Sequence, residues 1–116
     1  MLAESQLVHC GPLTIKVAHD ESAWTVSLQG ELDLATAEPV QRHLEIAMTD
    51  PGCESLVIDM SRLEFIDSTG IAVLVRTVQQ DAGFNRLRVV PSTALGVTRV
   101  LELTGVADRL AELHAA

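Results

Sequence analysis

The chain is poor in aromatic residues and in positive charge. Of its 116 residues 3% are aromatic, with one Trp, two Phe and no Tyr. Eight Lys and Arg residues stand against 16 Asp and Glu, which gives a formal net charge of −8. Nucleic-acid binding needs a basic stripe opposite the phosphates, and single strands also need rings on which bases stack. We therefore expect no direct nucleic-acid partner, and an anionic membrane surface is disfavoured for the same reason.

Cysteine pairs, histidine clusters and long apolar runs are also missing. Cys10 and Cys53 lie far apart and neither belongs to a Cys-x-x-Cys pair, so we expect two reduced thiols. The spacing of the four histidines does not suit zinc, which predicts no metal site. No apolar run approaches the roughly 20 residues that span a bilayer, and no signal-peptide pattern begins the chain. These absences predict a cytoplasmic protein.

What the chain does have is enough apolar material for one domain. Hydrophobic residues make up 47% and charged residues 21%, which excludes a disordered chain. We expect a single domain over residues 1–116, with a core from about 13 to 110 built of Val, Leu, Ile and Ala.

Hydrophobic periodicity predicts a mixed α/β fold. Alternating apolar residues at 13–17 and 24–28 predict two strands joined by a polar turn, hence an antiparallel pair. Residues 34–50 predict a helix, capped by Asp33 or Thr36, with a stripe of Val40, Leu44, Ala47 and Met48. The nearly continuous apolar run at 56–60 predicts a strand covered on both faces.

The second half of the chain continues this alternation. A helix is predicted over 68–82, with inward residues Ile71, Leu74, Val75 and Val78. A strand at 87–90 should end at Pro91, and Ser92 or Thr93 should cap a further helix that Gly105 closes. Residues 106–113 fit either a helical turn or a last edge strand. The order predicts a mixed four- to five-stranded sheet, with an N-terminal antiparallel pair followed by parallel, right-handed βα units.

The segment Asp67-Ser68-Thr69-Gly70 follows an apolar step at Leu63, Phe65 and Ile66 and opens the predicted 68–82 helix. Free N–H groups and the helix dipole converge at such a position, so it can hold an added anion. Taken alone, the triplet Asp67-Ser68-Thr69 is most simply explained by helix capping, with Asp67 as the N-cap. Gly70 is a poor helix former, and suits either close approach of another protein or internal packing.

Polar side chains should gather at the carboxyl ends of the parallel strands, where α/β sheets bind their ligands. Asp33, Asp59 and Asp67 are candidates for this edge, joined by Ser68, Thr69 and Ser92. Known catalytic motifs do not fit them: there is no Gly-Lys of a P-loop, and Ile66 stands where a hydrolase elbow needs Gly. The paired acids and the late lysine of a receiver domain are also missing. We therefore expect no enzyme and no cofactor.

Three stretches together resemble the STAS domain family, and more narrowly its stand-alone bacterial anti-sigma factor antagonists. They are Gly30-Glu31-Leu32-Asp33, then Val57-Ile58-Asp59-Met60-Ser61, and Leu63 through Ile71 with its Asp67-Ser68-Thr69-Gly70 step. A late Leu101-Glu102-Leu103-Thr104-Gly105 segment is similar as well. The resemblance covers about residues 13–110. It implies an anti-sigma factor antagonist that binds an anti-sigma factor with serine kinase activity and is released by phosphorylation, so that it regulates sigma-factor availability and transcription.

The resemblance also implies roles for individual residues. Ser68 matches the family's phospho-acceptor, with Thr69 as a secondary candidate. Asp67 would cap the helix and orient the hydroxyl, and Asp59 would lie near the site. The expected partner-binding residues are Asp33, Thr36, Asp67, Thr69, Gly70 and Ile71.

Two other functions and one departure from the family remain open. A STAS adaptor subunit of a transporter or stress-signalling complex would use the same fold without phosphorylation. A small-ligand or nucleotide module would use the same acidic edge, although negative charge disfavours phosphate there. Many members continue with a further strand and helix, so we expect a shortened C-terminal cover whose apolar edge favours a homodimer.

Overall fold

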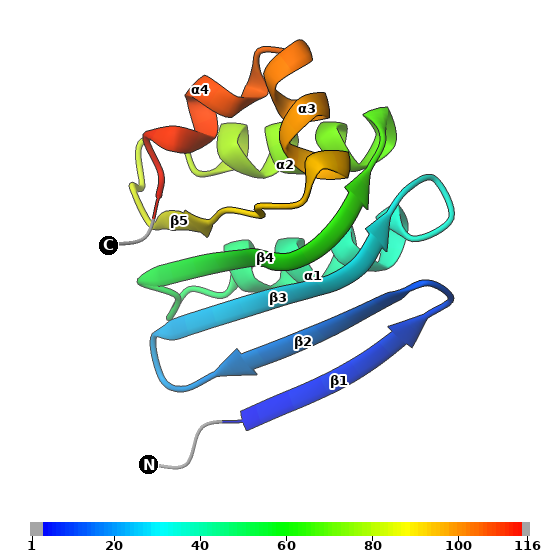
Figure 1. Ribbon diagram of the computed structural model, residues 1–116. Helices are drawn as coiled ribbons and strands as arrows, with labels where there is room; N and C mark the ends of the chain where they lie inside the picture. Colours follow the sequence, from blue (N-terminus) through cyan, green and yellow to red (C-terminus); the bar gives the residue numbers. More distant parts are fainter. Residues whose placement is uncertain (1–3, 115–116) are drawn as a thin grey trace.

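The computed structural model describes residues 4–114, which form a five-stranded mixed sheet with four helices (Figure 1). In chain order the elements are β1 (Glu4–Cys10), β2 (Leu13–His19), β3 (Ala23–Leu32), α1 (Ala37–Thr49), β4 (Ser55–Ile66), α2 (Ser68–Gln80), β5 (Leu87–Val90), α3 (Leu95–Leu103) and α4 (Val106–Ala111). The spatial order of the strands is the sequence order. Pairing is antiparallel from β1 to β3 and parallel from β3 to β5, which confirms the predicted mixed α/β fold.

The first strand, β1, is not predicted by the sequence pattern. It pairs with β2 over seven residues, from Glu4 opposite His19 to Cys10 opposite Leu13. Leu7 and Val8 are adjacent, and most of the strand is exposed, so no alternation of buried and exposed positions marks it. An edge strand beyond the last covering helix needs no such alternation, because neither of its faces is fully buried.

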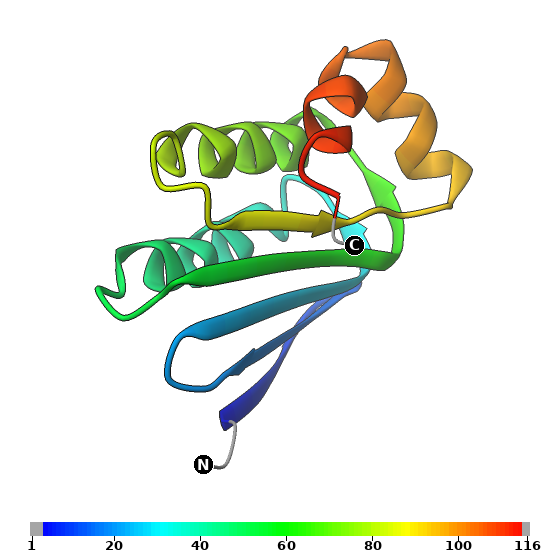
Figure 2. The same ribbon diagram turned by 90° about the vertical axis from the view of Figure 1, so that its left-hand side faces the viewer.

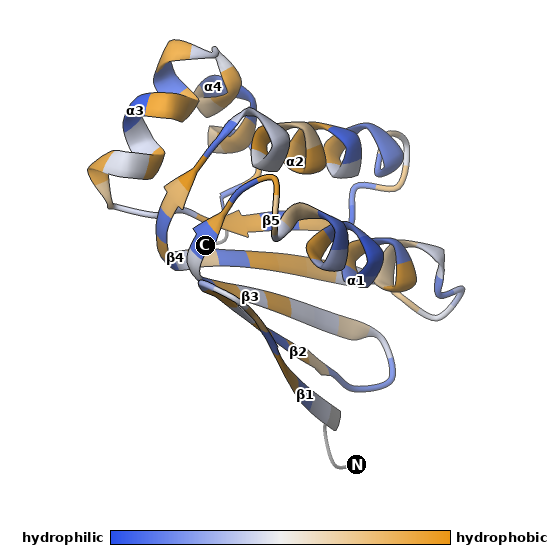
Figure 3. Ribbon diagram, turned by 90° about the vertical axis from the view of Figure 1, so that its right-hand side faces the viewer, coloured by the Kyte–Doolittle hydropathy of each residue, from blue (hydrophilic) through white to orange (hydrophobic). Residues whose placement is uncertain are grey.

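Helices α1 and α2 cover one face of the sheet, whereas α3 and α4 lie on the other side of β5, with α3 against the end of β4 (Figure 2). The face opposite α1 and α2 is open over β2 and β3, where Lys16 and Gln29 are exposed. Between these helices and the strands lies the core, where apolar segments of both layers face each other (Figure 3). The first half of β4 is covered on this side alone: Leu56, Ile58 and Met60 are buried, whereas Val57 and Asp59 are partly exposed. The prediction of a strand covered on both faces is therefore wrong for residues 56–60.

Strand β4 continues to Ile66, so the apolar step at Leu63 to Ile66 belongs to the same strand as residues 56–60. Its register with β3 shifts twice, between Ser27 and Gln29 and between Gly30 and Glu31, each time with an extra residue on β4. Such bulges bend a strand and interrupt its period of two. The buried positions become Met60, Leu63 and Ile66. The bend brings the end of β4 over to the start of α2 (Figure 1).

Helix α1 buries the predicted stripe of Val40, Leu44, Ala47 and Met48, but it begins at Ala37 rather than near 34. The predicted Thr36 does occupy the N-cap position, but no side chain makes a capping hydrogen bond to the first turn. In α2 the predicted residues Ile71 and Leu74 are buried together with Val73 and Thr77. Val75 and Val78, also expected inside, are only partly buried.

The C-terminal segment covers the β5 edge of the sheet. After α4, the Leu113 carbonyl accepts a hydrogen bond from the Val89 N–H at 2.7 Å, and His114 forms a parallel bridge with Val89. Residues 106–114 thus contain both a helix and a strand-like contact, which resolves the two alternatives left open. The expected apolar edge from a shortened C-terminus is not present among residues 4–114, because this segment already occupies it.

Candidate functional site

Two loops meet where the adjacent parallel strands β3 and β4 end. Leu32 and Ile66 are register partners at these ends, and the Asp67 N–H donates to the Leu32 carbonyl at 3.2 Å. We call this place the Ser68 rim and define it as residues 33–36 after β3 and 67–70 at the start of α2. The prediction that Asp33 and Asp67 share one edge of the sheet is confirmed.

The carboxylate of Asp67 closes the start of α2. Its Oδ1 accepts from the N–H groups of Thr69 at 2.9 Å and Gly70 at 3.1 Å. Its Oδ2 accepts from the N–H of Leu34 at 3.2 Å, which ties the first loop to the second. The predicted N-cap is confirmed, and each oxygen is engaged by backbone.

This cap changes two of the expectations for the helix start. The N–H groups of Thr69 and Gly70, which an added anion would use, already bind the protein's own carboxylate. Asp67 also makes no hydrogen bond to the Ser68 hydroxyl, so the expected orienting role is wrong. The rim is closed to an anion at these two donors and leaves the hydroxyl unconstrained.

Ser68 is the first residue of α2, and its side chain is exposed. Among residues 4–114 no group forms a hydrogen bond with its hydroxyl. The helix start does not need this hydroxyl as a cap, because Asp67 already supplies the acceptor. Ser68 is therefore the exposed hydroxyl of the rim, whereas Thr69 is half-buried.

Thr36 holds the first loop together from the inside. Its Oγ1 accepts from the Asp33 N–H at 2.9 Å and donates to the Glu31 carbonyl at 3.0 Å. The residue is 1% exposed. Its hydrogen bonds hold the loop in shape, and its side chain is not accessible to a partner. The expectation that Thr36 itself contacts a partner is therefore wrong. Asp33 is half-buried, and its Oδ1 accepts from the Ala35 N–H at 3.0 Å.

Gly70 is buried against the ends of β3 and β4. A Cβ on this residue would lie 2.9 Å from the Leu32 carbonyl oxygen and 2.8 Å from the Ile66 side chain. Its neighbour Ile71 is 7% exposed and belongs to the core. Of the two explanations open for Gly70, internal packing is the one that the geometry supports. Neither residue forms part of an exposed docking surface.

Two other expected members of the site lie elsewhere. Asp59 stands on the open face of the sheet opposite Ser27, with its Oδ1 accepting from the Ser61 N–H at 2.9 Å. It precedes the end of β4 by seven residues, or roughly 20 Å at the rise of a strand. Ser92 is buried, donates to the Leu63 carbonyl at 2.7 Å and accepts from the Ala94 N–H. Both side chains hold the local backbone in place through these hydrogen bonds. The expectation that Asp59 lies near Ser68 is wrong.

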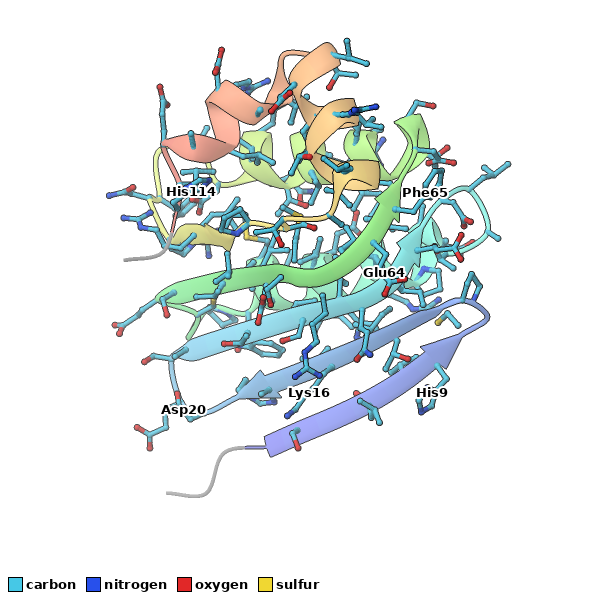
Figure 4. The ribbon with its side chains drawn as sticks, in the orientation of Figure 1. His9, Lys16, Asp20, Glu64, Phe65 and His114 are labelled. Atoms are coloured by element: carbon cyan, nitrogen blue, oxygen red, sulfur yellow. The ribbon has the colours of Figure 1, made fainter. Side chains whose placement is uncertain are left out.

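The sequence reasoning missed Leu34, which is 77% exposed beside Asp67. It lines one end of a groove between α1 and α2, about 570 Å³ in volume, to which Thr69, Arg42 and Arg76 also contribute. Phe65, just before the rim, is another exposed apolar residue (Figure 4). An isolated Leu within the polar run Asp33-Leu34-Ala35-Thr36 is the signal that could have identified it.

Three titratable groups outside the rim have displaced pKa values. Burial raises the pKa of the Cys53 thiol, whose Sγ donates to the Ser55 carbonyl. Burial, with a smaller contribution from Arg42, lowers the pKa of His43. Backbone donation from Ala23 and Ser22 lowers the pKa of Asp20 at the β2–β3 turn.

Residues 4–114 contain no cluster of three or more His, Cys, Asp or Glu residues with the geometry of a metal site. Over the same residues no helix combines the length and apolar character needed to cross a bilayer. Both cysteines are free thiols, Cys10 half-buried and Cys53 buried.

Several known proteins are similar to this chain. An anti-sigma F factor antagonist of Paenibacillus polymyxa is 33% identical over 63 residues, which is 54% of each protein. The anti-sigma-F factor antagonist RsfB of Mycobacterium tuberculosis is 33% identical over 69 residues, 59% of this chain and 55% of that protein. This chain thus matches about half the length of these relatives.

A solved structure extends the likeness to most of the fold. The crystal structure of an anti-sigma factor antagonist from Mycobacterium paratuberculosis superimposes with a TM-score of 0.73 at 28% identity. The match covers 84% of this chain and 81% of that one. The sequence profile of the STAS domain, in turn, matches residues 14–114. This range contains the whole Ser68 rim and all of the sheet except β1 and the first residue of β2. With this profile, sheet order and rim, the chain belongs to the STAS domain family.

Proposed function

We propose that this chain is an anti-sigma factor antagonist, a binding protein rather than an enzyme. In its unphosphorylated form it binds an anti-sigma factor that is also a serine kinase, and phosphorylation at Ser68 releases it. The antagonist names of the relatives support the class. The observation that carries the proposal is the exposed Ser68 hydroxyl, which no group among residues 4–114 engages, at the start of a fully capped helix.

The geometry of the rim supports Ser68 over its neighbours as the acceptor. Thr69 is half-buried in the α1–α2 groove, and its own N–H is held by Asp67. A kinase must bring the γ-phosphate in line with the hydroxyl oxygen, which requires open access to it. Ser68 offers that access, and Thr69 remains the secondary candidate. ATP and Mg²⁺ would come with the kinase, which places the reaction in the cytoplasm.

The negative charge of a phosphate on Ser68 would switch partner binding off. A phosphate on Ser68 adds about −1.5 to −2 charges at neutral pH. The carboxylates of Asp67 and Asp33 lie in the same rim, and Asp67 already occupies the N–H groups that could neutralise a phosphate. The added charge therefore faces the partner without compensation. A partner surface that fits a neutral hydroxyl beside the exposed Leu34 would have to bury this unpaired charge and would lose apolar contact.

Phosphate mapping tests the proposal. The protein is incubated with Mg²⁺–ATP and an anti-sigma factor kinase from the same organism, and the modified residue is identified by mass spectrometry. We expect phosphate on Ser68, and none on a Ser68→Ala variant. Titration calorimetry should show that Ser68→Ala binds the factor like the parent, whereas Ser68→Asp binds about tenfold or more weakly, a loss of roughly 1.4 kcal/mol.

Thr69→Val is the matched control, because it removes the neighbouring hydroxyl and keeps the shape. It should still be phosphorylated and should bind normally. Absence of phosphate from both Ser68 and Thr69 in the presence of an active kinase would contradict the switch. If binding persisted without any phosphorylation, the chain would be a STAS adaptor subunit that works without phosphorylation.

A further inference from the structure

The two edges of the sheet differ. At the β5 edge, the Val89 N–H donates to the Leu113 carbonyl and His114 bridges to Val89, so later chain occupies the outer side. At the opposite edge, β1 is the last strand, and nothing among residues 4–114 pairs with its outer side (Figure 1). His9 on β1 and His114 beside β5 mark these two edges (Figure 4). The backbone groups on the outer side of β1 are free to pair with another strand.

The β1 edge also has few of the features that usually prevent such pairing. Edge strands are commonly protected by charged side chains, by proline or by a bulge. Apart from Glu4 at its start, β1 contains no carboxylate, no ammonium group and no proline; residues 5–10 read Ser-Gln-Leu-Val-His-Cys. The register of β1 with β2 is continuous over seven residues, from Glu4 to Cys10, without a shift. Leu7 in the middle of the strand is 58% exposed.

We propose that two copies of this chain associate through antiparallel pairing of their β1 strands, which joins the two five-stranded sheets into one. A symmetric antiparallel pair must centre on one residue, because directly paired residues lie on the same face. Centring on Leu7 brings the two exposed Leu7 side chains together. Ser5 then faces His9 of the other copy, and Gln6 faces Val8.

Charge does not oppose this register locally. Lys16 lies directly across β1 from Leu7, on the strand behind it. In the dimer the two Lys16 side chains would be separated by three strand spacings, or about 14 Å, which exceeds the Debye length of about 8 Å at physiological salt. The net charge of −8 on each copy acts at longer range. Association should therefore strengthen as salt is added.

The interface is a single strand pair and leaves the Ser68 rim accessible, because β1 lies three strands away from β4. It buries less than the roughly 1,200 Å² typical of tight complexes, so the dimer should form reversibly with concentration. This inference is independent of the proposed function, and either can fail without the other. A strand from a different protein would compete for the same edge.

Sedimentation velocity tests the proposal, with the full chain measured from about 5 to about 500 μM. We expect a monomer–dimer equilibrium whose association constant rises several-fold between roughly 20 and 300 mM salt. The variant Leu7→Glu should weaken dimerisation at least tenfold. Within one copy the new carboxylate faces Lys16, so the monomer should remain folded, but across the dimer two carboxylates would oppose each other.

The matched control is Leu103→Glu, which makes the same change at an 87% exposed leucine of α3 and should dimerise like the parent. Hydrogen exchange adds an independent measurement: the amides of residues 5–10 that point away from β2, every second one along the strand, should become more protected at high protein concentration. A monomer at every concentration would overturn the proposal, as would an equal loss in both variants. A dimer that survives Leu7→Glu unchanged would assign the interface to another face.

Discussion

In the first turn of α2, the residues on the inner side pack against the sheet and bind backbone N–H groups, whereas the residue on the outer side is exposed. On the inner side, Gly70 packs on Leu32 and Ile66, and both oxygens of Asp67 bind backbone N–H groups. On the outer side, one residue away, Ser68 is exposed. The difference shows how a switch can be attached to a stable element: the residues that hold the helix are separate from the residue that would be modified.

The largest expected effect on the inner side comes from Asp67→Ala. It leaves the N–H groups of Thr69, Gly70 and Leu34 without their acceptor, and should lower the free energy of unfolding by about 2–3 kcal/mol. Urea denaturation followed by circular dichroism measures it. The control is Glu38→Ala, which removes an exposed first-turn carboxylate from α1 and should cost less than about 0.5 kcal/mol. Equal losses in both variants would refute a special role of the cap.

Gly70→Ala should come next, with a loss of about 2 kcal/mol. Alanine favours a helix by roughly 1 kcal/mol over glycine, but its Cβ would press on the Leu32 carbonyl and on two buried side chains. Ala72→Gly, on the exposed side of the same helix, measures the propensity term alone and should cost about 1 kcal/mol. A stabilised Gly70→Ala protein would show that internal packing does not require this glycine.

Thr36→Val should lower stability by about 1–2 kcal/mol. It keeps the buried shape but removes the hydroxyl that serves the Asp33 N–H and the Glu31 carbonyl. Thr36→Ser retains these hydrogen bonds and should lose less than about 1 kcal/mol. Thermal unfolding of the two variants side by side gives the comparison. If valine were the milder substitution, the loop would not depend on this hydroxyl.

The smallest effect is expected on the outer side. Ser68→Ala and Ser68→Asp should each change the free energy of unfolding by no more than about 0.5 kcal/mol. For the aspartate, attraction to the helix N-terminus opposes repulsion from Asp67. Chemical denaturation of both variants measures it. A loss above about 2 kcal/mol would mean that Ser68 also belongs to the structure, and the separation of the two sides would not hold.

Part of the fold was predictable because its elements have strong local periodicity. The stripe of α1 from Val40 to Met48 and the antiparallel pair β2–β3 follow from the spacing of apolar residues. Strand β1 could not be predicted, because an exposed edge strand carries no alternation. The continuation of β4 through Leu63 to Ile66 was missed because two bulges break its period of two.

The site was predictable in outline for a similar reason. Asp67 was predicted as a cap because an Asp before an apolar helical pattern is a local signal, and Asp33 was placed beside it by strand order. The burial of Thr36, Gly70 and Ile71 was not predictable, since it depends on how α2 sits over the ends of β3 and β4. The same holds for Asp59, which the path of β4 keeps away from the rim.

By itself the sequence determined the alternation of strands and helices, the helix start at Asp67 and the likeness to the STAS domain, because these are properties of neighbouring residues. Tertiary structure alone decided which polar groups remain free. Hydrogen bonds in the loops engage the polar groups of Asp67 and Thr36, and packing buries Gly70. The C-terminal segment covers the β5 edge of the sheet, so β1 is the edge that remains open. Ser68 stays exposed because other residues provide the helix cap, the loop hydrogen bonds and the packing around it.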